Sequence, residues 1–87
     1  MNKRIDNKFS VTEHGTIVNS KGIPIPDHEP KILFRGKDKL AVPMLHYYLA
    51  LCIEKGCTQE QEQSMRAMID EFKTFQEKFS ATVKLPD

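Results

Sequence analysis

Apolar residues in the second half of the chain recur at helical spacing and predict two helices. After Pro43, which suits the first position of a helix, an almost continuous apolar run leads to Lys55, and Gly56 is the left-handed residue expected at its end. Thr58 is followed three residues later by a glutamine, a capping-box pattern that begins a second helix. We expect this helix to run to about Lys78. Since few residues join the two helices, they should pack as an antiparallel hairpin.

The second helix carries a single apolar stripe. Its members are Met65, Met68, Ile69, Phe72, Phe75 and Phe79. All of them except Ile69 also fit a heptad seam. Such a seam can pair either with the first helix or with a second copy of itself.

The first half of the chain has the shorter, alternating patterns of strands. Phe9–Glu13 and Thr16–Asn19 predict a β-hairpin around a two-residue turn, His14-Gly15. The prolines of Ile23–Pro26 exclude a central strand, so this segment should be an extended edge whose isoleucines dock on an apolar surface. Lys31–Arg35, rich in β-formers and bounded by proline and glycine, is the strongest strand candidate.

The order of these elements predicts the α+β fold class: a small antiparallel sheet followed by a helical hairpin. The length of 87 residues indicates one domain. Within it we expect a flexible terminus (1–8), a small β region (9–35), the helical hairpin (39–79) and an extended tail (80–87). The tail could add an edge strand to Ile32–Phe34 of its own chain or of a neighbouring chain.

The first helix is apolar around almost its whole circumference, and a helix of that kind is expected to be buried on all sides. A chain this short has little material left to cover a third face, so a homo-oligomer is predicted. The alternative is a monomer in which loops and tail complete the core. The residues predicted at the oligomer interface are Leu45, Tyr48, Leu51, Phe72 and Phe75.

The distribution of charged residues along the chain is more informative than the net charge. The net charge is +1, but residues 31–55 carry five basic against two acidic residues. Arg35, Lys37 and Lys39 lie just before a helix N-terminus, where an anion is favoured, and Tyr47 could stack on a base. These four residues are the predicted ligand-binding residues. In the alternative interpretation, Asp38 caps its own helix and the basic residues form a solvated turn or offset the acidic last third of the chain.

Catalytic and metal-binding patterns are not found in the sequence. It contains no nucleophile elbow, phosphate loop or dinucleotide fingerprint, and its three histidines are dispersed. Cys52 and Cys57 lack histidines at zinc-finger spacing and are interpreted as incidental. We therefore expect neither enzyme activity, metal nor cofactor. The charged N-terminus and the lack of a long apolar run predict a cytoplasmic, reduced protein without a membrane segment.

The stretch from Gly22 to Pro30, followed by Ile32–Ala41, carries a Pro-x-x-Glu-Pro lead and an Arg-x-x-Asp turn before the helical hairpin. This pattern resembles small uncharacterised accessory proteins of tailed phages and prophages. In outline, the order of elements is also similar to phage anti-defence proteins that sequester signalling nucleotides.

These resemblances imply a phage accessory protein that antagonises a bacterial defence system. It would bind a signalling nucleotide or a host defence protein. The alternatives are a nucleic-acid-binding module that uses the basic loop, and a structural assembly or adaptor protein.

Overall fold

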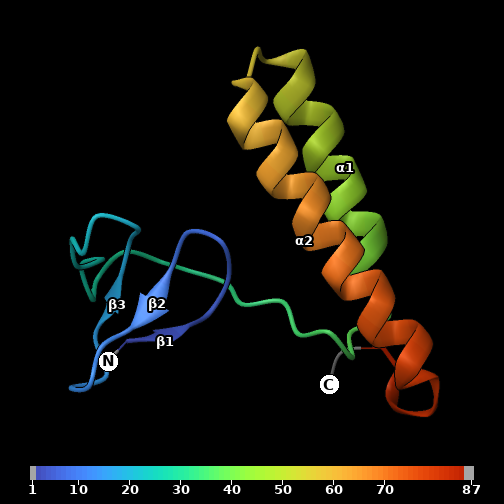
Figure 1. Ribbon diagram of the computed structural model, residues 1–87, viewed down its shortest axis with the longest axis horizontal. Coiled ribbons are helices and arrows are strands. Elements are labelled where there is room, and N and C mark those ends of the chain that lie inside the picture. Colours follow the sequence, from blue (N-terminus) through green and yellow to red (C-terminus); the bar gives the residue numbers. More distant parts are fainter. Residues whose placement is uncertain (1, 86–87) are drawn as a thin grey trace. The chain divides into compact units, whose positions relative to one another are not determined.

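The computed structural model describes residues 2–85 and divides the chain into two compact units, Met1–Ile32 and Leu33–Asp87. The first contains a three-stranded sheet and the second a helical hairpin (Figure 1). A small antiparallel sheet followed by two helices is the α+β fold that the sequence predicts. The length predicted one domain, whereas the structure divides into these two compact units. The boundary between them falls inside Lys31–Arg35.

The sheet has the order β1-β2-β3 and is antiparallel throughout. Its strands are Lys3–Arg4 (β1), Ser10–Val11 (β2) and Ile17–Val18 (β3). The predicted hairpin is therefore present, but the prediction that residues 1–8 form a flexible terminus misses β1. Asp6 explains this strand, because its carboxylate accepts the backbone N–H groups of Lys8 (2.8 Å) and Phe9 (2.8 Å) and so closes the β1–β2 turn.

The β2–β3 turn contains three residues, and the two-residue turn predicted at His14-Gly15 is wrong. Gly15 N donates to Thr12 O (3.0 Å), and Thr16 N donates to the Thr12 hydroxyl (3.1 Å). Gly15 takes the left-handed conformation, with φ of 84°, which ends a three-residue hairpin loop. The Thr12 hydroxyl favours the longer loop, since it gives the N–H beyond the glycine a local acceptor.

Ile23–Pro26 is an extended edge segment, as predicted. Ile25 N donates to Ile17 O (2.9 Å), and Pro24 forms a bridge with Val18. Val18, only 3% exposed, is the buried apolar residue of this unit. Ile25 is half-buried, whereas Ile23 remains exposed and does not dock as expected.

Lys31–Arg35 is irregular backbone, so the strongest strand prediction is wrong. Ile32 is 80% exposed and Leu33 is 67% exposed. A strand is stabilised by cross-strand pairing, and β-propensity supplies no partner by itself. No ladder partner lies along this segment within the described chain.

The first helix, α1, spans Ala41–Glu54 and begins two residues before Pro43. Pro43 is thus its third residue, where the missing N–H costs nothing because the first-turn N–H groups have no intrahelical acceptor. Gly56 has φ of 83°, as predicted for the left-handed residue that ends the helix. Gly56 N donates to Ile53 O (3.1 Å) and Cys57 N to Cys52 O (2.9 Å), which together form a Schellman motif.

The second helix, α2, spans Gln59–Lys78 and confirms the predicted capping box. The Thr58 side chain accepts from Gln61 N (3.1 Å), and the Gln61 side chain accepts from Thr58 N (2.9 Å). The helices pack side by side, as Figure 1 shows. Leu49 of α1 and Ile69 of α2 are the buried residues at mid-helix, with 5% and 3% exposure.

The tail folds back onto the segment before α1. After a 3₁₀ turn at Ser80–Thr82, Lys84 N donates to Lys37 O (3.0 Å) and Lys39 N donates to Lys84 O (2.7 Å). The predicted pairing of the tail with Ile32–Phe34 of its own chain is therefore wrong, and pairing with a neighbouring chain stays a prediction. The last two residues of that tail lie outside the described residues.

Candidate binding surfaces of the helical hairpin

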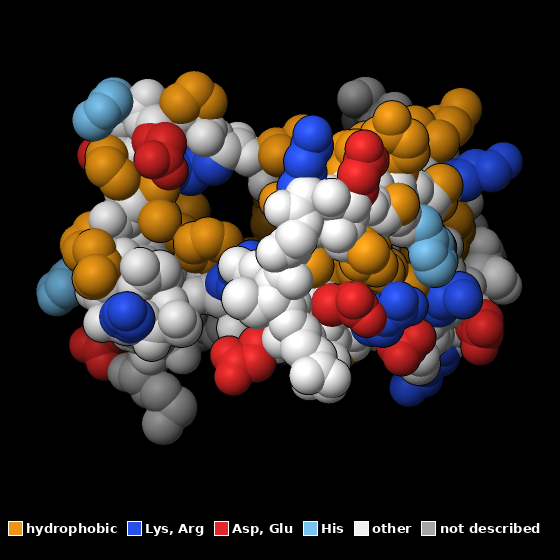
Figure 2. All heavy atoms as spheres, turned by 90° about the horizontal axis from the view of Figure 1, so that it is seen from above, with side chains coloured by type: hydrophobic (Ala, Val, Ile, Leu, Met, Phe, Trp, Pro, Cys, Tyr) orange, Lys and Arg blue, Asp and Glu red, His pale blue; other side chains and the backbone are white. Residues whose placement is uncertain are grey.

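One face of α1 presents apolar side chains to solvent. These residues, named the α1 stripe here, are Leu40 (44% exposed), Met44 (49%), Tyr47 (65%), Tyr48 (54%) and Leu51 (39%). They recur three or four residues apart and therefore share one side of the helix. In the space-filling view, hydrophobic side chains reach the surface of the hairpin between charged ones (Figure 2). The stripe itself contains no charged residue.

The inner face of α1 lies about 120° around the helix from the stripe, by the 3.6-residue period. Leu45, Leu49 and Cys52 are its half-buried or buried members at successive turns. The expectation of burial on all sides thus holds for this face alone. Ile53 is 46% exposed and belongs to a different side of the helix from the α1 stripe.

The five predicted interface residues occupy three different environments. Leu45 and Phe72 are half-buried, at helical spacing from the buried Leu49 and Ile69, and so lie on the inner faces of the hairpin. Tyr48 and Leu51 belong to the exposed α1 stripe. Phe75 is 37% exposed and packs against the backbone at Gly36, where an added Cβ would lie 2.8 Å from its Cδ1 atom.

The basic loop, residues 35–39, is held by α2 through a residue that the sequence analysis did not single out. Gln76 Nε2 donates to the carbonyl oxygens of Gly36 (3.1 Å) and Asp38 (2.9 Å). Gln76 is half-buried and falls four residues after Phe72 on the inner face of α2. A polar residue in phase with an apolar stripe is the signal that could have identified it, because a half-buried amide needs hydrogen-bond partners.

The predicted ligand-binding residues flank this anchored backbone. Arg35 and Lys39 are exposed and Lys37 is half-buried, while Tyr47 lies on the α1 stripe. Asp38 accepts Leu40 N at 2.8 Å, so its carboxylate closes the turn that leads into α1. The N-cap of α1 is Leu40 and no side chain caps this helix, so Asp38 closes the preceding turn without capping α1. The exposed basic side chains extend from a backbone of defined shape.

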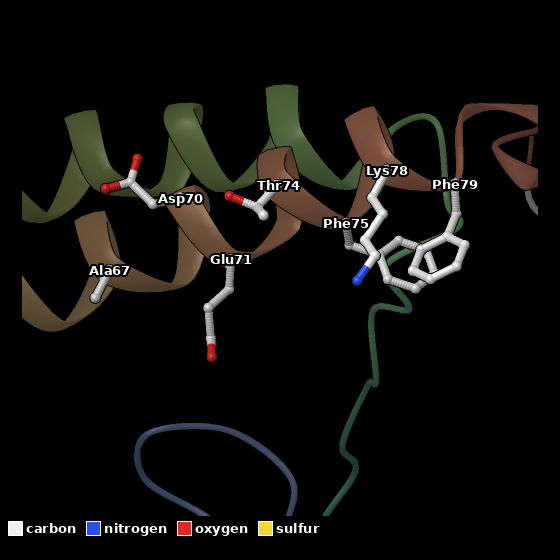
Figure 3. A pocket seen from close by; sticks show the side chains of 7 residues that line it. All are labelled: Ala67, Asp70, Glu71, Thr74, Phe75, Lys78 and Phe79. Atoms are coloured by element: carbon white, nitrogen blue, oxygen red, sulfur yellow. The ribbon is translucent and has the colours of Figure 1, made fainter.

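A shallow depression of about 560 Å³ lies on α2. It is lined by Ala67, Asp70, Glu71, Thr74, Phe75, Lys78 and Phe79 (Figure 3). The Phe75 and Phe79 rings have centroids 4.9 Å apart, and Lys78 Nζ lies 5.6 Å from the Phe79 centroid. None of the four predicted ligand-binding residues lines this depression, and its own lysine already lies against the aromatic face.

Residues 2–85 contain neither a cluster of metal-ligating side chains nor a helix that could cross a membrane. No three His, Cys, Asp or Glu side chains in that range come together as metal ligands would. Neither helix in that range combines the length and the apolar character that a bilayer crossing requires.

No family model, curated protein or solved structure matches this chain. Functional inference therefore rests on the surfaces described above.

Proposed function

We propose that this chain is a non-enzymatic binding protein that acts as a dimer through its α1 stripe. The observation that supports this is the exposure of five large apolar or aromatic side chains on one side of a single helix. Contiguous apolar patches on a monomer usually mark an interaction surface. Tyrosine suits such a surface, since its ring can be buried while its hydroxyl stays at the wet rim.

The occupant that we propose for the stripe is a second copy of the chain. The exposed parts of the five side chains form a patch of roughly 500 Å². Two copies related by a twofold axis would bury at most about 1,000 Å² in total, which is the size that a biological interface should reach. In a twofold dimer the same patch meets itself. The stripe itself contains no charged side chain, so its own members do not repel one another in that pairing.

Leu51→Glu is expected to convert the dimer into a monomer. The substitution places a carboxylate within the paired stripes, where it would be buried without a partner. Light scattering or sedimentation at tens of micromolar protein measures the mass. Circular dichroism should show that the helical content is retained, because Leu51 is 39% exposed and its replacement leaves the inner face intact.

Ile53→Glu is the matched control. Ile53 lies two residues away in the same helical turn, with 46% exposure, but on another side of α1. This variant should keep the dimer mass. A monomeric wild-type protein, or equal loss of the dimer in both variants, would reject the α1 stripe as the interface.

For the target of this binding protein, we propose a component of a bacterial defence system, following the resemblance of Gly22–Ala41 to tailed-phage accessory proteins. The anchored loop favours an anionic target such as a signalling nucleotide. This proposal is supported by the two hydrogen bonds from Gln76, which hold the backbone between Arg35 and Lys39. A basic loop of fixed shape loses less conformational entropy on binding than a mobile one.

Arg35→Ala combined with Lys39→Ala is expected to abolish stabilisation of the protein by nucleotides. A cyclic or linear nucleotide present at 100 times its Kd should stabilise the wild-type protein by about 2.7 kcal/mol in thermal unfolding. Lys73→Ala, which removes an exposed charge from α2, is the control and should leave that stabilisation unchanged.

The absence of stabilisation by any nucleotide would reject the nucleotide as target and leave a defence protein. Nucleic acid would instead be indicated by binding to oligonucleotides whose affinity falls steeply with salt and is lost in the same double variant.

A further inference from the structure

The two cysteines occupy paired positions of the turn between the helices. In the Schellman motif that ends α1, the carbonyl of Cys52 accepts the N–H of Cys57 at 2.9 Å. This contact assigns them to the third residue from the helix end and the second residue beyond the cap, whose side chains commonly touch in this motif. Their spacing in the sequence, which suggested no site, is therefore the spacing that the motif brings together.

The hydrogen bond also limits the distance between the two α-carbons. The Cys52 carbonyl oxygen is about 2.4 Å from its own Cα, and Cys57 Cα is about 1.5 Å from its N. With the 2.9 Å between that oxygen and that nitrogen, the α-carbons lie at most about 6.8 Å apart. Disulfides span about 4.4–6.8 Å between α-carbons, so this upper limit falls within the range that a bridge can span.

Both cysteines are free and half-buried. Gly56 between them holds the turn, with φ of 83° and nothing within 4 Å of where a Cβ would lie. The turn is therefore open to a small oxidant while its backbone keeps the two cysteines close.

We propose that Cys52 and Cys57 form a reversible dithiol–disulfide site, oxidised by small disulfides such as glutathione disulfide. One cysteine thiolate attacks the oxidant, forming a mixed disulfide and releasing one glutathione thiolate. The other cysteine thiolate then attacks the protein sulfur of that mixed disulfide and releases the second glutathione. Two protein S–H bonds are lost and one S–S bond forms, while the two electrons reduce glutathione disulfide to two thiols.

Closure of this bridge turns a hydrogen-bonded helix end into a covalent one. It joins the last turn of α1 to the loop that leads into Thr58, the N-cap of α2. The oxidised hairpin should therefore resist unfolding more than the reduced hairpin, and a reducing agent should reverse the gain. The site responds to oxidants independently of the α1 stripe and of the basic loop.

The test exposes the reduced full chain to glutathione disulfide, quenches it with a maleimide and measures the intact mass. The expected product has lost two hydrogens, carries neither glutathione nor maleimide, and remains a single chain on a non-reducing gel. Its Tm should rise and return to the original value with dithiothreitol. Cys57→Ser should stop at the mixed disulfide on Cys52.

Gly56→Ala keeps both thiols but disfavours the left-handed turn, so its closure should be several-fold slower at the same pH. Closure by the wild-type chain in urea should likewise be slower than by the native chain. Three results would overturn the proposal: persistent glutathione on both cysteines, a disulfide between chains, or closure that is equally fast in the native, urea-unfolded and Gly56→Ala proteins.

Discussion

Ile69→Ala is expected to lower the free energy of unfolding of the helical hairpin by about 2–5 kcal/mol, the range for truncating a buried isoleucine. Ile69 is only 3% exposed and is the buried residue of α2. A hairpin with so few enclosed side chains has little with which to fill the cavity. Urea unfolding followed by circular dichroism, at one fixed protein concentration, measures the change.

Ile53→Ala provides the matched comparison, because it is the same substitution on the partner helix. With 46% exposure, Ile53 loses little buried area, so this variant should cost less than about 1 kcal/mol. If both variants were destabilised equally, Ile69 would not be the centre of the interface between the helices.

Gly36→Ala is expected to destabilise the hairpin by about 1–3 kcal/mol, as overpacking does. The new Cβ would lie 2.8 Å from Phe75 Cδ1 and 3.1 Å from Cγ, distances at which the ring or the backbone must move. The ring cannot retreat freely, since it also packs on Phe79 at 4.9 Å between centroids. Moving the backbone instead would strain the hydrogen bond from Gln76 to Gly36 O.

Phe75→Ala tests whether the Phe75 ring causes the destabilisation expected for Gly36→Ala. In a chain that already carries Phe75→Ala, the space over Gly36 is open, and adding Gly36→Ala should cost far less than in the wild-type chain. The double-mutant cycle should therefore give a coupling free energy above about 0.5 kcal/mol. Additive costs would mean that Phe75 is not what excludes a side chain at position 36.

These two predictions concern the hairpin that presents every candidate surface of this chain. The α1 stripe is exposed because α2 covers only the face that contains Leu49. The basic loop has its shape because Gln76 and Lys84 hold its backbone. Stability measurements on Ile69 thus test the scaffold separately from the binding surfaces, whereas those on Gly36 test how the basic loop packs on α2.

The helices could be predicted because their signals are local. The capping box at Thr58 and the left-handed Gly56 each form hydrogen bonds within a few residues. An α-helix also satisfies its backbone within the same segment. The positions of α1 and α2 therefore follow from residues close to their ends, and the one shift, at Pro43, stays within the first helical turn.

The strands were predicted less well because a strand needs a partner that its own residues do not specify. Lys31–Arg35 has the composition of a strand and no ladder, whereas the polar Lys3–Arg4 is a strand because the turn at Asp6 places it beside β2. Backbone pairing between segments decides both outcomes. Composition alone favours a strand at Lys31–Arg35 over one at Lys3–Arg4, and the structure has the reverse.

The candidate surfaces, like the secondary structure, could be predicted from the sequence only in part. The residue types were visible in the sequence: the excess of apolar residues on the first helix and the basic residues from Arg35 to Lys39. The packing of α2 against α1 decides which apolar residues stay exposed. Leu45 and Phe72 are therefore half-buried, whereas Tyr47 is exposed on the α1 stripe. The anchoring of the basic loop depended on Gln76, some forty residues further along the chain.

The sequence by itself determined the α+β class, the two helices and their caps, since each of these depends on contacts among near neighbours. Only the tertiary structure decided the partners of the irregular segments and the exposed side of α1. These depend on which backbone and side-chain groups come together in space, and hydrogen bonds and close packing act over a few ångströms regardless of separation along the chain.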